Sequence, residues 1–355
     1  MTAKSTVQRR RVVRGMTPGE VRTPAVAAGG RCGQTVRVHD DAAATPTGTI
    51  WILGAAGQLG TALRSRAPDG VEIRALSSAD IDLADADSVA SALATLRAGD
   101  VVLNTAAYTA VDAAESDADA AWAVNAVAPG LLADATAAAN AWLIHVSTDY
   151  VFGDAVAGTA APGAVQRPMR TTPYEPGDDA DSLPPATVYG ASKLAGERAA
   201  LAADPTATIV RTAWVYTGGP DSPDFVGTMR RLERSRDTIT VVDDQTGSPT
   251  YAVDLADGLW ELVAGGRRPP VAGKILHATN TGAATWYDVA REVFTLVGAD
   301  PDRVRPCSTD DFPRPAPRPA YSVLSARAWE RAGLTPLREW SAAVRAAVTS
   351  TTGSG

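Results

Sequence analysis

A short apolar segment followed by a glycine-rich turn constrains the fold of this chain more than any other feature. The segment 49–53 leads into Gly54, Gly57 and Gly60, and helical patterning begins soon afterwards, at residues 61–63. In dinucleotide-binding folds, a strand of this kind ends in such a turn and opens a helix. The first glycine permits the tight turn, the second lets the backbone approach a pyrophosphate, and the third allows the helix to pack closely on the sheet. We therefore predict that backbone N–H groups at the start of this helix hold the phosphates of a coenzyme.

Further apolar segments alternate with alanine-rich helical stretches. We predict strands at 71–76, 100–104, 141–146 and 208–216, and helices within 88–96 and 120–139. Strands that are almost wholly apolar and are separated by helices indicate a parallel sheet covered on both faces. The predicted fold class is therefore α/β, a Rossmann-type doubly wound parallel sheet with a smaller C-terminal α/β lobe that binds substrate.

Charge and proline content divide the chain into segments. Residues 1–48 contain eight basic and three acidic residues, which gives +5, whereas the whole chain carries −7. We predict that this segment is a disordered basic N-terminal extension, or that translation starts further downstream than the first residue given; a surface-binding or nucleic-acid-binding arm is the other possibility. Residues 49–217 are expected to form mainly the NAD(P)-binding domain, with a Pro-rich insertion at 153–186. Residues 218–350 are expected to form mainly the substrate-binding lobe, interleaved with that domain.

Composition excludes several classes of protein. Two cysteines cannot build a disulfide framework, and three histidines without an H-x-x-x-H spacing argue against a histidine metal site. The acidic net charge argues against nucleic acid as the main partner. The sequence has no run of 18 or more apolar residues, so we predict no membrane-spanning helix. We expect a cytoplasmic enzyme that acts on a small molecule.

Tyr189 and Lys193 form the most chemically specific pair. They are four residues apart, so a helix places them on one face, where the ammonium is expected to lower the pKa of the phenol. The third member is expected at the end of the fourth strand, where Thr148 or Ser147 can polarise a substrate carbonyl. His145, in the same segment, is predicted to be a core residue of the strand rather than a catalyst.

The coenzyme remains open between NADPH and NADH. An NAD-selective site carries an acidic residue at the end of the second strand, and residues 75–78 contain none. Asp80 and Asp82 follow the strand, and Arg74 is a candidate for contact with a 2′-phosphate.

Several motifs together resemble those of the extended short-chain dehydrogenase/reductases and, within them, the dTDP-4-dehydrorhamnose reductases. The resemblance covers nearly all of residues 49–345. It rests on Gly54-x-x-Gly57-Gln-Leu-Gly60, Asn104-Thr-Ala-Ala-Tyr-Thr-Ala-Val-Asp112, Val124-Asn125, Ser147-Thr-Asp-Tyr-Val-Phe-Gly153, Tyr189-Gly-x-Ser-Lys193-x-x-Gly-Glu197, Arg211-Thr-x-Trp-Val-Tyr216, Asp244-Gln-Thr-Gly-Ser-Pro-Thr250 and Arg318-Pro-x-x-Ser-Val-Leu324.

This resemblance implies a catalytic triad of Thr148, Tyr189 and Lys193. It implies coenzyme contacts at Gly54, Gly57, Gln58, Leu59, Gly60, Asp82, Leu83, Ala106, Ala107, Tyr108, Tyr189 and Lys193. It implies substrate contacts at Thr109, Val111, Thr148, Asp149, Tyr150, Trp214, Asp244 and Gln245. The implied reaction is reduction of the C4 keto group of dTDP-6-deoxy-L-lyxo-4-hexulose by NADPH or NADH to dTDP-L-rhamnose, by a monomer or homodimer. We predict no required metal.

The chain departs from the family pattern in two places, the longer insertion between Phe152 and Tyr189 and the basic N-terminal extension. Two rival functions stay open. One is a nucleotide-sugar epimerase or dehydratase that retains its NAD, although such dehydratases carry Asp-Glu where this chain has Asp149-Tyr150. The other is a non-catalytic regulatory subunit of the kind that serves methionine adenosyltransferase, which the intact triad argues against.

Overall fold

The computed structural model describes residues 48–153, 170–178 and 183–350. The predicted N-terminal extension lies outside the described residues apart from Gly48, and so do residues 154–169 and 179–182 of the predicted insertion. All described residues belong to one compact unit, Ala42–Gly355. None of the helices in these described ranges is long and apolar enough to span a membrane.

A parallel sheet of six strands forms the centre of this unit. Its strand order is β10-β5-β4-β3-β1-β2, and every neighbouring pair runs parallel. The strands are β1 (Ile50–Leu53), β2 (Ile73–Leu76), β3 (Val101–Asn104), β4 (Trp142–Thr148), β5 (Thr208–Thr212) and β10 (Ile275–His277). This order, with strands added in both directions from β1 and β3, confirms the predicted doubly wound Rossmann-type fold.

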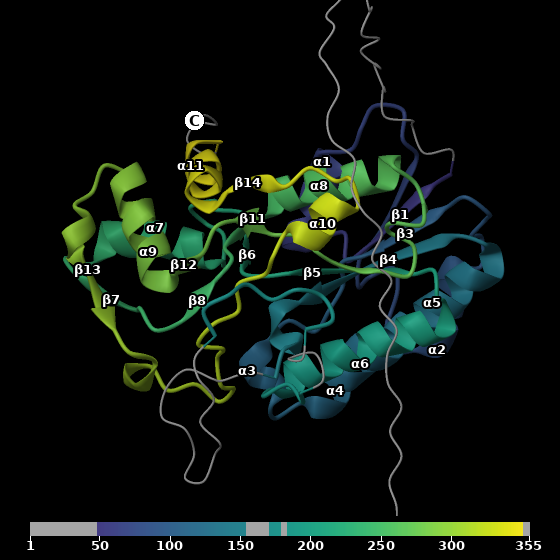
Figure 1. Ribbon diagram of the computed structural model, residues 1–355, viewed down its shortest axis with the longest axis horizontal. Coiled ribbons are helices and arrows are strands. Elements are labelled where there is room, and N and C mark those ends of the chain that lie inside the picture. Colours follow the sequence, from purple (N-terminus) through teal and green to yellow (C-terminus); the bar gives the residue numbers. More distant parts are fainter. Residues whose placement is uncertain (1–47, 154–169, 179–182, 351–355) are drawn as a thin grey trace, which may run out of the picture. The chain divides into compact units, whose positions relative to one another are not determined.

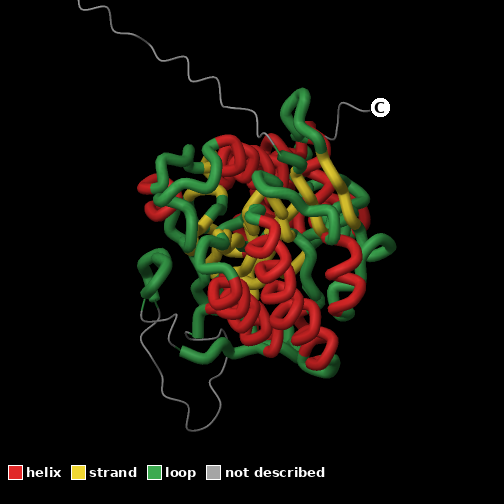
Figure 2. Tube along the Cα trace, turned by 90° about the vertical axis from the view of Figure 1, so that its right-hand side faces the viewer, coloured by secondary structure: helices red, strands yellow, loops and turns green. Residues whose placement is uncertain are grey.

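Helices cover both faces of the sheet (Figures 1 and 2). On one face lie α1 (Gln58–Ser65) and α8 (Ala252–Ala264), and on the other α2 (Ala86–Leu93), α5 (Ala128–Ala139) and α6 (Val188–Ala203). Successive side chains of a strand point to opposite faces of the sheet, and helices cover both faces here. The first strand, β1, is therefore apolar at every position. Ile50 and Ile52 pack into the core under α1 and α8, whereas Trp51 and Leu53 pack into the core under α2, α5 and α6.

Two predicted elements are interrupted in the structure. The predicted strand 208–216 ends at Thr212 because Trp214 has a left-handed backbone, with φ 48°. The segment after it, β6 (Val215–Tyr216), pairs with β9 (Thr250–Tyr251) instead of the sheet. The predicted helix 120–139 consists of α4 (Ala118–Trp122), a π-helical turn at Ala123–Val127 and α5. Pro129 in the first turn of α5 has no N–H to continue the preceding ladder.

The C-terminal part has a second core. This core is formed by α7 (Phe225–Ser235), β7 (Ile239–Val242), β12 (Ala284–Thr285), α9 (Trp286–Leu296), β13 (Val304–Cys307) and α11 (Trp340–Ser350). The remaining short elements of the C-terminal part are β8 (Thr246–Gly247), β11 (Asn280–Thr281), α10 (Arg327–Arg331) and β14 (Leu337–Glu339), and the short helix α3 (Val111–Ala114) follows β3. Strand β7 pairs with β13, and both lie at the left of Figure 1. Because α8 and β10 belong to the central layers, the chain passes between the two parts more than once. The predicted domain boundary at 217 and 218 stays a prediction.

The two Pro-rich stretches contain no helix or regular strand in the parts that the structure describes. Residues 170–178 and 183–186 form turns and one isolated bridge, between Tyr174 and Leu324, and residues 312–319 are likewise irregular. Proline cannot donate to a helix or strand ladder, so this agrees with the predicted loops.

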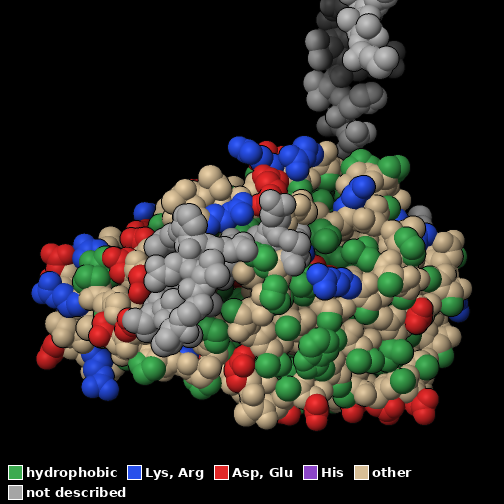
Figure 3. All heavy atoms as spheres, turned by 60° about the horizontal axis from the view of Figure 1, so that its bottom comes forward, with side chains coloured by type: hydrophobic (Ala, Val, Ile, Leu, Met, Phe, Trp, Pro, Cys, Tyr) green, Lys and Arg blue, Asp and Glu red, His purple; other side chains and the backbone are tan. Residues whose placement is uncertain are grey.

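Apolar side chains also reach the surface on the helix layer below the sheet in Figure 1. Figure 3, which brings this side forward, shows apolar side chains gathered above a rim of carboxylates. Trp122 is 43% exposed and Val127 is 56% exposed, and both come from α4 and the π-helical turn that follows it.

A buried ion pair ties α6 to the sheet. The Arg211 guanidinium on β5 donates to both carboxylate oxygens of Glu197, at 2.9 and 2.7 Å, and the two side chains are 1% and 2% exposed. Each charge therefore depends on the other for compensation, because neither reaches water.

Replacing one partner of this pair should destabilise the fold strongly. Arg211→Met leaves a buried carboxylate without its cation, and we expect a loss of about 3–5 kcal/mol in the free energy of unfolding, measured by urea denaturation. Arg66→Met is the matched control, because Arg66 pairs with Asp257 on the surface, with 50% and 41% exposure. That variant should lose no more than about 1 kcal/mol. Equal losses in the two variants would contradict the account.

Candidate active site

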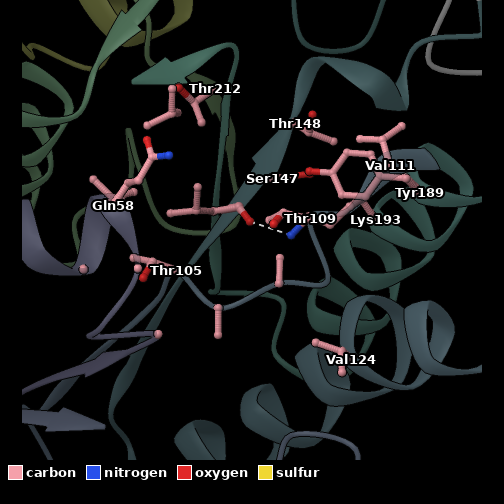
Figure 4. A pocket seen from close by; sticks show the side chains of 18 of the residues that line it. Gln58, Thr105, Thr109, Val111, Val124, Ser147, Thr148, Tyr189, Lys193 and Thr212 are labelled. Carbon is pink, nitrogen blue, oxygen red and sulfur yellow. Dashed lines mark hydrogen bonds between the residues drawn. The ribbon is translucent and has the colours of Figure 1, made fainter. Parts of the chain in front are cut away.

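A cavity of about 790 Å³ opens at the carboxyl ends of the central strands. We call it the main cavity. It is lined by Gly54 after β1, Thr105 after β3, Thr148 at the end of β4 and Thr212 at the end of β5. Figure 4 shows Gln58 and Thr212 on one side and Thr148, Tyr189 and Lys193 on the other. Of the site residues that the family resemblance implies, all line this cavity except Tyr108, Asp244 and Gln245. Arg74 and Asp80, the further candidates near the coenzyme, do not line it. The individual roles of all these residues stay predictions.

The glycine turn has the geometry that its sequence predicts. Gly54 has φ +76°, and a Cβ there would lie 2.7 Å from the Ala106 nitrogen. A Cβ on Gly60 would lie 2.2 Å from the Gly54 carbonyl oxygen. Helix α1 begins at Gln58 after Gly57, with no side-chain cap, so its first N–H groups have no side-chain acceptor. The turn and this helix end therefore fit a coenzyme diphosphate.

The end of β2 lies beside this turn and carries no carboxylate. Ser77 and Ser78 line the main cavity, together with Asp82 further along the chain. The Asp80 carboxylate accepts hydrogen bonds from the Ser77 hydroxyl, at 2.7 Å, and from the Ser77 backbone N–H, at 2.8 Å. Arg74 lies over the Trp51 ring and donates to Thr95. The serines at this position leave room for a 2′-phosphate as well as for a ribose hydroxyl.

The loop after β3 is held from below by a side chain of the π-helical turn. Asn125 accepts from the Tyr108 N–H at 2.9 Å and donates to the Tyr108 carbonyl at 3.0 Å. Ala106 and Ala107 consequently face the main cavity. The Tyr108 hydroxyl is turned to Asp117, at 3.2 Å, so only the backbone of Tyr108 belongs to this loop contact.

Tyr189 is buried at the start of α6, and its pKa is not lowered as its spacing from Lys193 predicts. The pKa of Tyr189 is raised to about 12, chiefly because the phenol is buried and also because of the nearby charge of Asp149, whereas the Thr148 hydroxyl acts to lower it. The expectation of a lowered pKa was wrong because the Lys193 amine is directed elsewhere. Its Nζ donates to the Val146 carbonyl at 2.7 Å and lies 3.2 Å from His145 Nε2. A phenol that keeps its proton at neutral pH can still act as a proton donor.

Lys193 is also buried, at 1% exposure. Burial lowers its pKa to about 8, while the charge of Glu197 raises it. His145 was predicted to be a core residue, and it is buried as expected. Its contact with Lys193, however, makes it part of the site, and no sequence signal indicated that contact, because the two residues are far apart in the chain.

Asp149 follows Thr148 directly and is enclosed by the site. Its Oδ1 accepts from the Thr148 hydroxyl at 3.0 Å. Its Oδ2 has no hydrogen-bond partner within the described ranges. Burial is the main reason that the pKa of Asp149 is raised to about 6, although the hydroxyls of Ser322 and Thr148 act to lower it. A carboxyl of this kind changes charge within the range of pH in which enzymes work.

A stacked pair of tryptophans forms the far wall. The rings of Trp214 and Trp286 are 3.6 Å apart and nearly parallel, at 5°. The left-handed backbone of Trp214 and the absence of a side chain on Gly247 allow this stack, since a Cβ there would lie 2.4 Å from the Trp214 ring. Sequence reasoning missed Trp286, which belongs to no motif that we identified.

A second cavity, of about 1080 Å³, lies on the other side of Trp286. Trp286 lines both cavities, and Gln245 lines the second and accepts from the Trp286 indole N–H at 3.2 Å. Arg314 and Arg318 also line the second cavity, and both pair with Asp112. Asp244 lines neither cavity, because its carboxylate accepts from the backbone N–H and hydroxyl of Thr309.

Comparison with known proteins places this geometry in context. The sequence model of the RmlD substrate binding domain family matches residues 48–352. A dTDP-4-dehydrorhamnose reductase of Mycolicibacterium smegmatis is 51% identical over 86% of this chain and 86% of its own length. A dTDP-4-keto-6-deoxy-D-glucose reductase of Streptomyces niveus is 40% identical over 83% of this chain and 94% of its own. The crystal structure of a Bacillus anthracis dTDP-4-dehydrorhamnose reductase in complex with NADP has a TM-score of 0.71 and 30% identity, and covers 86% of this chain and 99% of its own.

The raised pKa of Asp149 predicts a stability that falls as the pH rises. The folded state holds this proton more tightly than the unfolded state, so stability is lost between about pH 4 and the folded pKa of about 6. Asp149→Asn removes the effect, and at pH 7.5 the variant should be more stable than the parent by about 1–3 kcal/mol. Urea denaturation at pH 4 and 7.5 measures the difference, which should shrink at the lower pH.

A control aspartate should behave in the opposite way. Asp224 caps α7 and accepts from the Gly227 N–H, and its hydrogen bonds with Gly227, Ser222 and Thr217 hold its pKa below the usual value although burial opposes them. Asp224→Asn should therefore destabilise the chain at pH 7.5. A destabilised Asp149→Asn variant at that pH would contradict the account of Asp149.

Proposed function

Because this chain belongs to the RmlD substrate binding domain family, we propose that its main cavity reduces the C4 keto group of dTDP-6-deoxy-L-lyxo-4-hexulose to the hydroxyl of dTDP-L-rhamnose, with NADPH or NADH. The observation that carries this proposal is that Thr148 and Tyr189 line one wall of this cavity together with Lys193. The glycine turn that fits a coenzyme lines the same cavity. A proton donor and a hydride donor that share one cavity are what the reduction of a ketone requires.

The residues of the main cavity divide the chemistry between them. When bound, the coenzyme supplies the hydride. Gly54, Gly57 and the first turn of α1 hold its diphosphate, and Lys193 holds its ribose. The Thr148 hydroxyl binds the substrate carbonyl oxygen, and Tyr189 donates its proton to that oxygen as negative charge develops there. Burial of Tyr189 keeps the phenol protonated until that charge develops.

The second cavity is suited to the dTDP part of the substrate. Its wall combines the aromatic rings of Phe225, Trp286 and Phe312 with the guanidinium groups of Arg314 and Arg318. Aromatic side chains stack on nucleotide bases, and one arginine guanidinium can donate two parallel hydrogen bonds to phosphate oxygens. Since Trp286 lines both cavities, we propose that the sugar lies in the main cavity and the nucleotide in the second.

Two rival functions fit these residues less well. A dehydratase needs a second acid beside the strand-end threonine, and this chain has Tyr150 there, packed edge-on against Tyr189 at 5.6 Å. A purely regulatory subunit has no use for a buried Thr148, Tyr189 and Lys193 in one cavity. Reduction of dTDP-4-keto-6-deoxy-D-glucose is a closer alternative, supported by the Streptomyces niveus relative at 40% identity. The greater identity to the Mycolicibacterium smegmatis enzyme favours the rhamnose reaction.

We also propose that the chain works in the cytoplasm, as a monomer or a homodimer. Its substrate and coenzyme are small molecules that cells make in this compartment. The exposed apolar side chains of Trp122 and Val127 provide a surface on which a second copy can pack.

Removing the phenol oxygen tests the proton donor. Tyr189→Phe should reduce the single-turnover rate of hydride transfer by ~10²–10⁴-fold at saturating coenzyme, because it deletes the general acid. Coenzyme affinity should barely change, since the glycine turn and Lys193 remain. Tyr216→Phe, which removes a phenol from the C-terminal core, is the control and should keep its rate. A Tyr189→Phe variant with more than about a tenth of the parental rate would refute the assignment.

Removing the shared tryptophan tests the route of the substrate. Trp286→Ala deletes the ring that lines both cavities, so the Kd for dTDP, measured by calorimetry, should rise roughly tenfold or more. Trp286→Phe keeps an aromatic face and should show a smaller effect. Trp122→Ala removes an exposed tryptophan of α4 that lines neither cavity, and it should leave the Kd for dTDP unchanged. The proposed route fails if Trp286→Ala binds dTDP as the parent does.

A further inference from the structure

Lys193 has two polar neighbours, and neither of them is the tyrosine with which its spacing pairs it. Its Nζ donates to the Val146 carbonyl and lies 3.2 Å from Nε2 of His145. Helix α6 supplies the lysine, and strand β4 supplies both neighbours. The imidazole is 1% exposed, so it exchanges no hydrogen bonds with bulk water.

The other ring nitrogen of His145 contacts the neighbouring strand. Asn104 at the end of β3 is the register partner of His145. Its Nδ2 lies 2.9 Å from His145 Nδ1. The orientation of this carboxamide follows from its oxygen, which accepts from the Ala106 N–H at 3.2 Å. Because Oδ1 is used for the loop, the NH₂ group faces the imidazole and donates to it.

Counting donors and acceptors then fixes the proton on His145. A neutral imidazole has one N–H donor and one acceptor nitrogen. Since Nδ1 accepts from Asn104, Nε2 carries the hydrogen, and this hydrogen points at the Lys193 nitrogen. An ammonium group has three donors and no acceptor, so it would oppose that N–H. A neutral amine has one lone pair and two hydrogens, and it can accept from His145 while donating to Val146.

We propose that His145, oriented by Asn104, is a positioning residue that donates from Nε2 to the uncharged amine of Lys193 and so determines when this lysine gains or loses its charge. The inference rests on the proposed role of Lys193 in holding the coenzyme and serving Tyr189. It adds a link through which the loop at Ala106 is connected to the lysine, by way of Asn104 and His145.

The surroundings of the pair agree with an uncharged amine and an uncharged imidazole. Burial lowers the pKa of Lys193 to about 8. Burial and the neighbouring lysine hold the pKa of His145 well below its ordinary value. The charged group that acts on Lys193 is Glu197 on α6, and the group that acts on His145 is Lys193 itself. Tyr189 and Asp149 are the other titratable groups that line the main cavity beside Lys193. Glu197 favours the ammonium, but its carboxylate is engaged by Arg211, which limits that effect.

The histidines allow a direct spectroscopic test on the coenzyme-free chain. The sequence has only three, His39, His145 and His277, so ¹⁵N-histidine labelling gives few signals, which single His→Gln variants assign. His145 should carry its proton on Nε2. His277 is the internal control with the opposite tautomer, because its Nδ1 lies 3.1 Å from the Tyr174 carbonyl, which can only accept. A proton on Nδ1 of His145, or a doubly protonated His145 at pH 7, would overturn the proposal.

Asn104→Asp tests the coupling to Lys193. A carboxylate only accepts, so it should draw the imidazole proton to Nδ1 and leave the Nε2 lone pair facing the lysine. That arrangement favours the ammonium, and the titration midpoint of Lys193 should rise by about one pH unit or more. The chain has three lysines, and ¹³Cε labelling follows Lys193 beside Lys4 and Lys274, which serve as reference signals.

A double-mutant comparison separates the imidazole from the added charge. In the His145→Phe background, Asn104→Asp should shift the Lys193 midpoint much less, because only the distant carboxylate remains. Equal shifts in the two backgrounds would overturn the proposal. If Asn104→Asp fails to fold, the tautomer of the parental chain still decides. The His145 tautomer and the Lys193 titration midpoint are measured without substrate or catalysis. A chain that proved not to be the proposed reductase could therefore still confirm or overturn the role of His145, and failure of one proposal is distinguishable from failure of the other.

Discussion

The carboxyl ends of four parallel strands meet at one edge of the sheet, and the rest of the site depends on that arrangement. Parallel strands require crossover helices, so each strand end is followed by a turn at the same edge. The turns after β1 and β3 and the ends of β4 and β5 therefore line one cavity. The fold brings the glycine turn and Thr148 together although they are distant in the sequence. Helix α6 packs beneath β4 and adds Tyr189 and Lys193 from below.

Burial is the second physical theme of the site. Tyr189, Lys193 and Asp149 are all enclosed, and their pKa values are displaced in the direction that disfavours charge. A ketone reductase gains from this, because a phenol that resists ionisation keeps its proton for the developing alkoxide. The cost appears in stability, since Asp149 must lose a proton while buried as the pH rises. The wall of the cavity also contains an unfavourable conformation, because Trp214 is a non-glycine residue with a left-handed backbone. That backbone places its ring against Trp286.

Much of this architecture could be predicted from local patterns, and the parts that could not are contacts across the chain. The apolar segments predicted the strands because buried parallel strands are apolar on both faces, as Ile50 and Trp51 illustrate. The break at Trp214 could not be predicted, because residues 208–216 all favour β-structure locally. Only the folded chain shows that the strand ends at Thr212 and that Val215 and Tyr216 pair with β9 instead. The spacing of Tyr189 and Lys193 predicted a shared helix face, but it could not show that the lysine turns towards His145. Trp286 lies in no motif, and only the folded C-terminal part brings it to the cavity.

The fate of one hydrogen atom tests the central claim most directly. The chain would be incubated with NADPH deuterated at the transferable position and, in separate samples, with dTDP-6-deoxy-L-lyxo-4-hexulose or dTDP-4-keto-6-deoxy-D-glucose, and the products examined by NMR. The account predicts one deuterium at C4 of dTDP-L-rhamnose for each coenzyme oxidised. A product with deuterium at C4 in the D-gluco series would indicate the alternative substrate. Sugar that changes without oxidation of the coenzyme, or hydrogen that exchanges with solvent at other carbons, would contradict the account and indicate epimerase or dehydratase chemistry.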